Sequence, residues 1–152
     1  MNTRILLLAH APLASALREC ALHVFADSAD DVLALDVPAA EAPEATLARA
    51  RLWLQVHGGL ELPTLVLTDI FGATPCNVAQ QLVAQMPARL VAGVNLPMLL
   101  RSICYRAEGL EQLQARAMVG GSQGVMQVGV STPLNQSSRP SNNDQDQNHH
   151  QQ

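Results

Sequence analysis

The chain has 152 residues, of which 48% are hydrophobic and 14% charged, a composition typical of one folded domain with a buried core. The net charge is -4 and all nine basic residues are arginines, so nucleic acid is not expected as a partner, because phosphate neutralisation needs a basic patch. No apolar run is long enough for a membrane span, and no secretory signal pattern opens the chain. Three scattered cysteines fit free thiols, so we expect a cytoplasmic protein without direct membrane insertion.

Strand and helix patterns alternate from Arg4 to Val119. Apolar runs without polar alternation are typical of strands covered on both faces, and they predict strands at residues 4–9, 32–36, 65–68 and 89–93. Amphipathic segments with proline, threonine, asparagine or glycine at their starts predict helices at residues 12–25, 43–56, 74–86, 97–105 and 109–119. The alternation predicts an α/β fold, a three-layer, doubly wound and mainly parallel sheet in a flavodoxin-like order.

The character of the chain changes after Val119. Gly120 and Gly121 are expected to end the last helix, and residues 125–128 form a candidate strand for antiparallel pairing with another subunit of a dimer. Residues 131–152 are rich in Gln, Asn and Ser and cannot repay their ordering entropy, so a disordered tail is expected after a domain at residues 1–130. His149 and His150 in this tail are read as solvated side chains rather than as metal ligands.

Polar residues end two of the predicted strands. His10 follows the first strand and Asp69 follows the third, and in a parallel sheet such strand ends lie on one edge, where ligands bind. A neutral imidazole offers one nucleophilic nitrogen while a carboxylate holds the other. We therefore expect His10 as a nucleophile and Asp69 as the partner that fixes its tautomer; the alternative for Asp69 is a turn former before Gly72.

The surroundings of this pair favour a phosphoryl group. Helices are expected to begin near Pro12, at Thr74 and near Asn95, and each start offers unpaired backbone N–H groups to an anion. Thr74 has the side chain of an N-cap, and its hydroxyl is expected either only to cap the helix or also to bind phosphate. These loops contain no arginine, so amides and dipoles would hold the phosphate.

Other residues of these loops have simpler interpretations. Phe71 and Met98 are expected as pocket walls or as docking surface, and Asn95 as the cap of the short helix after the fourth strand. Cys76 is interpreted as a packed thiol. His10, His57 and Asp69 lack a recognisable ligand spacing, so neither a metal nor another cofactor is expected.

Three motifs together resemble a known family. His10 at a strand end, residues 68–77 (TDIFGATPCN) and residues 91–99 (VAGVNLPML) resemble the mannose-family IIA component of the phosphoenolpyruvate-dependent sugar phosphotransferase system (PTS). The resemblance covers roughly residues 3 to 128. It implies that His10 accepts a phosphoryl group from the phosphocarrier protein HPr and passes it to a IIB component, making the chain a phosphotransferase. It also implies that Asp69 orients His10, that Ala73 and Thr74 contact phosphate, and that a homodimer exchanges a C-terminal strand.

The chain departs from the family pattern at two places. Ala11 and Pro12 stand where the family usually has glycine after the histidine, and residues 72–75 read Gly-Ala-Thr-Pro where the family usually has Gly-Gly-Ser-Pro. Alanine in place of glycine is tolerated where φ is negative, and threonine keeps the hydroxyl of serine. A regulatory module, whose phosphorylation controls a partner without sugar transport, is the alternative function. A nucleotide-binding or small-molecule domain is disfavoured, because no glycine-rich phosphate loop is present.

Overall fold

The computed structural model describes residues 1–130, and the expected tail at residues 131–152 lies outside this range. The sheet consists of β1 (Arg4–His10), β2 (Val32–Val37), β3 (Thr64–Thr68) and β4 (Ala88–Ala92), all parallel and in the order β2-β1-β3-β4. The helices are α1 (Leu13–Val24), α2 (Pro43–Val56), α3 (Thr74–Val83), α4 (Leu96–Cys104) and α5 (Leu110–Gln123). A short 3-10 helix at Ala26–Ser28 was not predicted. The α/β fold with a parallel, doubly wound sheet is thus confirmed.

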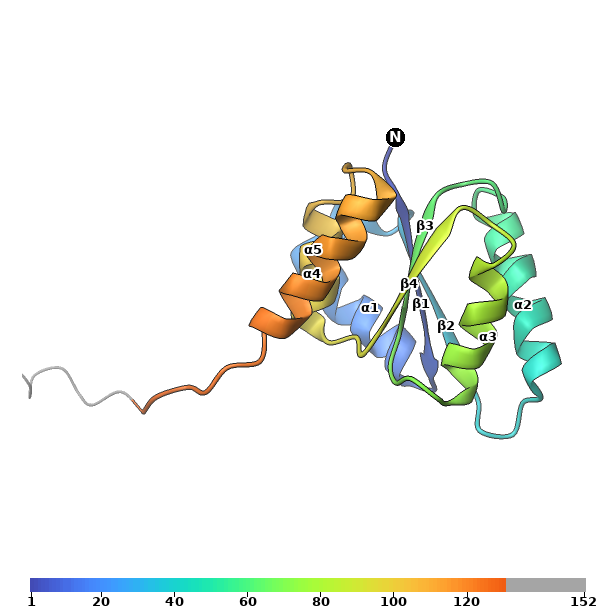
Figure 1. Cartoon of the computed structure of the whole chain (residues 1–152), viewed down its shortest axis with the longest axis horizontal. Helices are drawn as coiled ribbons and strands as arrows, with labels where there is room; N and C mark the ends of the chain where they lie inside the picture. The colour runs from blue at the N-terminus through green and yellow to red at the C-terminus, as the bar shows by residue number, and fades with distance from the viewer. Residues whose placement is uncertain (131–152) are drawn as a thin grey trace, which may run out of the picture.

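Helices cover both faces of the sheet. Figure 1 shows α1, α4 and α5 on one face and α2 and α3 on the other. The central strand β1 contributes to both cores: Ile5 and Leu7 pack in the core under α1, α4 and α5, and Leu6 and Leu8 in the core under α2 and α3. Because alternate side chains of a strand point to opposite faces, a strand buried on both faces has the unbroken apolar run found in the sequence.

The strand register brings four loops to the carboxyl edge of the sheet. His10 is paired with Val37 of β2, Leu8 with Thr68 of β3, and Thr68 with Ala92 of β4. The expected neighbourhood of the first and third strands is confirmed, since β1 lies between β2 and β3. The residues that follow each strand therefore lie side by side, which places His10 and Asp69 on one surface.

The last helix is longer than predicted. Gly120 and Gly121 do not end α5, which continues to Gln123. Both glycines are buried against α4, where a Cβ on Gly120 would stand 2.7 Å from Cβ of Arg101 and a Cβ on Gly121 2.6 Å from Cε of Met98. The glycines therefore allow the two helices to approach closely, and packing outweighs their weak helix propensity.

Substitution of Gly120 by alanine is expected to destabilise the domain. A Cβ in contact with Arg101 forces α4 and α5 apart, at a cost of about 1–3 kcal/mol that exceeds the gain of about 1 kcal/mol in helix propensity. Urea unfolding of Gly120→Ala measures the difference in the free energy of unfolding. Gly129→Ala is the control, since a Cβ there has no neighbour within 4 Å. A Gly120→Ala variant more stable than wild type would contradict this account of the contact.

The predicted strand at residues 125–128 is not formed in the single chain. Residues 125–130 have no regular secondary structure, and Val125 and Val128 are 77% and 80% exposed. Figure 1 shows this segment leaving the domain after α5. A strand needs the backbone of a neighbour for its hydrogen bonds, so exchange between subunits stays a prediction. No helix within residues 1–130 is long and apolar enough to cross a membrane.

Candidate functional site

His10 and Asp69 are in direct contact at the carboxyl edge. His10 Nδ1 lies 2.6 Å from Asp69 Oδ2, and the backbone N–H of His10 donates to the same oxygen at 3.1 Å. The His10 side chain is 48% exposed, whereas that of Asp69 is 12% exposed. The carboxylate thus supports an imidazole that faces solvent.

Asp69 is held by its own loop as well as by His10. The backbone N–H of Ile70 donates to Asp69 Oδ1 at 3.0 Å. Burial raises the pKa of the Asp69 carboxyl, but the hydrogen bonds from the side chain and backbone of His10 outweigh it and leave the pKa below its ordinary value. An ionised carboxylate only accepts hydrogen bonds, so Nδ1 of His10 carries a proton, and in the neutral ring Nε2 then has the free lone pair.

The lowered pKa of Asp69 predicts how its contribution to stability depends on pH. The folded pKa lies below the unfolded value of about 3.9, so the contribution is complete above that value and is lost as pH falls through the folded pKa. Urea unfolding of wild type and Asp69→Asn from neutral to acid pH is expected to show a stability difference that shrinks below about pH 4. A difference that grows with acidity would contradict the ion-paired carboxylate.

Two of the three predicted helix starts are already occupied by side chains. Asp36, at the end of β2, accepts hydrogen bonds from the backbone N–H of Ser15 at 3.0 Å and from its hydroxyl at 2.5 Å, which caps α1. Asn95 caps α4 as predicted, because its Oδ1 accepts from the N–H of Met98 at 2.9 Å. The capping role of Asp36 was missed, although its position at a strand end, like that of Asp69, was the available signal.

The start of α3 remains open to an anion. The N-cap is Ala73 and not Thr74, which is the first helical residue, and no side chain caps this helix. The prediction of Thr74 as the N-cap is wrong, because Ala73 has the extended backbone of a cap and Pro75 already lies inside the first turn. Among the described residues, the N–H groups of Thr74 and Cys76 have no protein acceptor. Free N–H groups at a helix start suit an anion.

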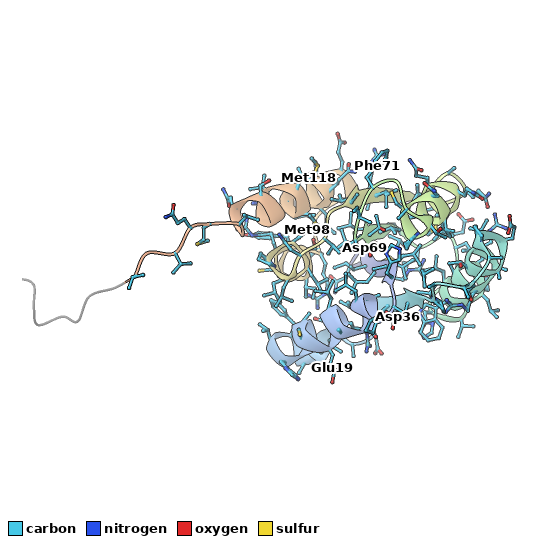
Figure 2. The ribbon with its side chains drawn as sticks, turned by 90° about the horizontal axis from the view of Figure 1, so that it is seen from below. Glu19, Asp36, Asp69, Phe71, Met98 and Met118 are labelled. Atoms are coloured by element: carbon cyan, nitrogen blue, oxygen red, sulfur yellow. The ribbon has the colours of Figure 1, made fainter. Side chains whose placement is uncertain are left out.

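The loop before α3 is shaped for an exposed turn. Gly72 has φ of +91°, a conformation that favours glycine, whereas Ala73 has φ of −108°, which alanine adopts without strain. Ala73 therefore has the negative φ that allows alanine to stand where the family usually has glycine. Ile70 and Phe71 in the same loop are 56% and 74% exposed, and Figure 2 shows Phe71 at the rim of the surface around Asp69.

Asn95 and Met98 belong to a neighbouring cavity of about 320 Å³ beside β4. Met98 is only 5% exposed, so it is a wall of this cavity and not part of an outer docking surface. The amide of Asn95 donates to the backbone oxygen of Gly121 at 3.1 Å, which joins α4 to α5. Cys76 is buried, as a packed thiol requires.

The candidate site is open rather than enclosed. A cavity of about 600 Å³ between α1, β2 and α2, with Trp53 in its lining, does not include His10 or Asp69. Within residues 1–130, no group of three histidine, cysteine, aspartate or glutamate side chains is placed to hold a metal ion. An exposed imidazole on an open surface suits a macromolecular partner better than a small substrate, which enclosed sites bind.

Comparison with known proteins bears on this arrangement. The model of the PTS system fructose IIA component family, EIIA-man, matches residues 4–119. The chain belongs to this family. The resemblance stated from the sequence motifs is confirmed, and the chain is a IIA component of a sugar phosphotransferase system. No curated protein matches the chain.

Solved structures of IIA proteins share the fold. The mannose/sorbose specific IIA subunit from Enterococcus faecalis is 26% identical with a TM-score of 0.78, and the match covers 88% of this chain and 100% of that chain. A phosphotransferase system component EIIA from Streptococcus agalactiae is 23% identical with a TM-score of 0.70, over 82% of this chain and 96% of that one. The PTS IIA protein associated with the fucose utilization operon of Streptococcus pneumoniae is 22% identical with a TM-score of 0.67, over 84% and 93%.

Proposed function

We propose that this IIA component accepts a phosphoryl group from phosphorylated HPr on Nε2 of His10 and passes it to a IIB component. The observation that carries the proposal is the 2.6 Å contact between His10 Nδ1 and Asp69, which in the neutral ring assigns the proton to Nδ1 and the lone pair to Nε2 of a side chain that is 48% exposed. Membership of the IIA family supports the same chemistry. The site suits a protein partner, since the His10 side chain is 48% exposed and lies outside the cavity of about 600 Å³.

The chemistry is a displacement at phosphorus. The lone pair of Nε2 attacks the phosphorus, the bond between phosphorus and the donor breaks, and its electron pair leaves with the donor. The ring then carries a proton on Nδ1 and the phosphoryl group on Nε2, so it is positive, and the Asp69 carboxylate stabilises that charge. Because the ring is positive, the N–P bond is polarised and breaks readily, so the phosphoryl group can pass to the next acceptor.

The neighbouring residues have supporting roles in this proposal. Ala73 and Thr74 at the open start of α3 hold the phosphoryl oxygens through backbone N–H groups and the Thr74 hydroxyl. Phe71 contacts the protein partner, while Asn95 and Met98 keep α4 in place beside the site. The active form is a cytoplasmic homodimer in which residues 125–128 pair with the other subunit.

A regulatory phospho-switch is the second candidate. Phosphorylation of His10 adds a charge of about −2 to the surface. The exposed Ile70 and Phe71 follow Asp69 in the same loop, so a protein bound to them would meet that charge. A target protein that binds only one charge state would be controlled without any onward transfer. Acceptance of the phosphoryl group is common to both functions.

Transfer of isotope from labelled phosphoenolpyruvate tests the proposal and separates the two candidates. The chain is incubated with enzyme I and HPr, and IIB proteins are then added. Label that reaches the chain and moves to a IIB protein supports the transport function. Label that stays on the chain with every IIB protein of the source organism favours the phospho-switch. A chain that takes no label from phosphorylated HPr would rule out both.

A further inference from the structure

The loop between β2 and α2, residues 38–42, lies beside His10 on the side away from Asp69. β1 pairs with β2 on one side and with β3, which leads to Asp69, on the other. Val37 is paired with His10, and its backbone oxygen accepts from the N–H of Ala11 at 3.0 Å. Neighbouring strands lie about 4.8 Å apart, so this loop begins about one strand spacing from the backbone of His10.

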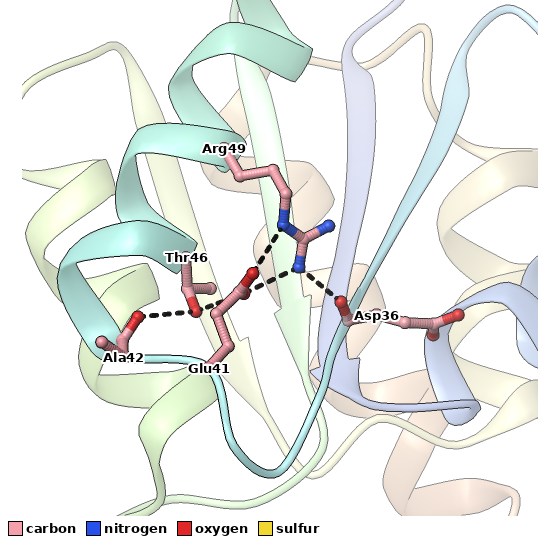
Figure 3. A network of polar contacts seen from close by, with 5 residues as sticks. All are labelled: Asp36, Glu41, Ala42, Thr46 and Arg49. Carbon is pink, nitrogen blue, oxygen red and sulfur yellow. Dashed lines mark hydrogen bonds and ion pairs between the residues drawn. The ribbon is translucent and has the colours of Figure 1, made fainter.

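A clamp centred on Arg49 of α2 fixes both ends of this loop (Figure 3). Arg49 Nη2 donates to the backbone oxygen of Asp36 at 2.7 Å, and its Nε and Nη2 donate to Glu41 at 3.1 and 2.9 Å. The Thr46 hydroxyl donates to Glu41 at 2.6 Å. The hydrogen bonds from Arg49 and then Thr46 hold the pKa of Glu41 below its usual value, so the carboxylate stays charged and paired.

The outer surface of the loop is small and uncharged. Pro38, Ala39 and Ala40 are exposed. Glu41 is the one charged residue of the loop, and its carboxylate is paired with Arg49. A partner that covers these residues desolvates no side-chain polar group and immobilises no long side chain. The clamp also orders the backbone of the loop before any partner binds, so a protein that contacts the loop loses less conformational entropy on binding.

We propose that residues 38–42 form one half of the docking surface for the protein phosphoryl donor, with Ile70 and Phe71 as the other half, and that Arg49 is the positioning residue of the first half. This inference rests on the proposed function. A stable protein contact covers about 800 Å² on each partner, a patch roughly 30 Å across, which is several times the distance between neighbouring strands. A protein that reaches Nε2 of His10 from solvent therefore has to meet the loops on both sides of β1.

The test compares two arginines with matched ion pairs. Arg116 on α5 donates to Glu108 through Nε at 3.2 Å and Nη2 at 2.9 Å, and each glutamate precedes its arginine by eight residues. Initial rates of phosphorylation of Arg49→Gln and Arg116→Gln are measured against the concentration of phosphorylated HPr. Chemical phosphorylation of His10 by phosphoramidate, which releases ammonia and needs no docking, is measured in parallel.

The expected result is a KM for phosphorylated HPr that rises about tenfold in Arg49→Gln, with kcat changed less than about twofold. Labelling by phosphoramidate stays at the wild-type rate, and Arg116→Gln behaves as wild type in both assays. Arg49→Lys, which keeps the charge but loses the planar fork, recovers part of the lost affinity.

An unchanged KM in a folded Arg49→Gln variant would overturn the inference, as would an equal fall in labelling by phosphoramidate. If Arg49→Gln does not fold, Ala39→Glu supplies the test, since it places a charge on the outer surface without touching the clamp; an unchanged KM there overturns the inference too. Failure of the proposed function has a different signature, because wild type itself would then take no phosphate from HPr.

Discussion

Replacement of His10 by glutamine is expected to abolish phosphoryl acceptance from HPr. The glutamine amide is polar and of similar length, but its nitrogen has no free lone pair to attack phosphorus. The His10 side chain is 48% exposed, so the substitution leaves the core intact and the melting temperature close to that of wild type. The measurement is the incorporation of label from phosphoenolpyruvate in the presence of enzyme I and HPr.

His23→Gln is the matched control for this prediction. His23 is an exposed histidine in the last turn of α1, at the end of the helix away from His10, and its replacement should leave incorporation at the wild-type level. Incorporation that persists in His10→Gln, or that disappears in His23→Gln, would place the acceptor elsewhere in the chain.

Substitution of Asp69 by asparagine is expected to slow phosphoryl acceptance by about two orders of magnitude or more. The amide oxygen still accepts a hydrogen bond from Nδ1, but the negative charge that stabilises the phosphorylated, positive ring is lost. In wild type, Nδ1 and the backbone N–H of His10 both contact Oδ2 of Asp69. In the variant, only the amide oxygen can accept these two hydrogen bonds, because the amide nitrogen is a donor. Single-turnover rates with saturating phosphorylated HPr measure the effect on the chemical step.

Asp31→Asn serves as the control for this effect. Asp31 forms an ion pair with Arg106 at 3.0 Å and precedes β2, so it lies at the amino end of the strands. The same loss of one carboxylate charge at that end should leave the rate within about twofold of wild type, because a charge far from the reacting ring is screened by solvent. Equal losses in both variants would show that net charge, and not the His10 contact, sets the rate.

The α/β architecture and the contact between His10 and Asp69 could be predicted from the sequence, because both follow from the patterns that mark where strands begin and end. Strands buried on both faces appear as unbroken apolar runs, and β1 and β3 were recognised in this way. In a parallel sheet all strands end at one edge, so His10 and Asp69 were expected to meet without knowledge of any side-chain conformation. Family membership confirms the class of protein that these motifs indicated.

The details that escaped prediction depend on contacts between distant segments. Asp36 caps α1 across the gap from β2, so the start of α1 is occupied although no residue near Pro12 indicates it. Gly120 lies within α5 because Arg101 leaves no room for a side chain, a constraint that helix propensity does not contain. The cap of α3 shifted by one residue to Ala73, and such boundaries are set by backbone geometry rather than by residue type alone.

Intact-mass spectrometry of the wild-type chain, followed by peptide mapping, tests the central claim most directly. The chain is incubated with phosphoenolpyruvate, enzyme I and HPr, and a parallel sample omits HPr. The account predicts the mass of one phosphoryl group, added only when HPr is present, located on the peptide that contains His10 and lost in mild acid, as an N–P bond requires. No added mass while HPr itself is phosphorylated, or an acid-stable phosphate on a hydroxyl such as that of Ser15, would contradict it.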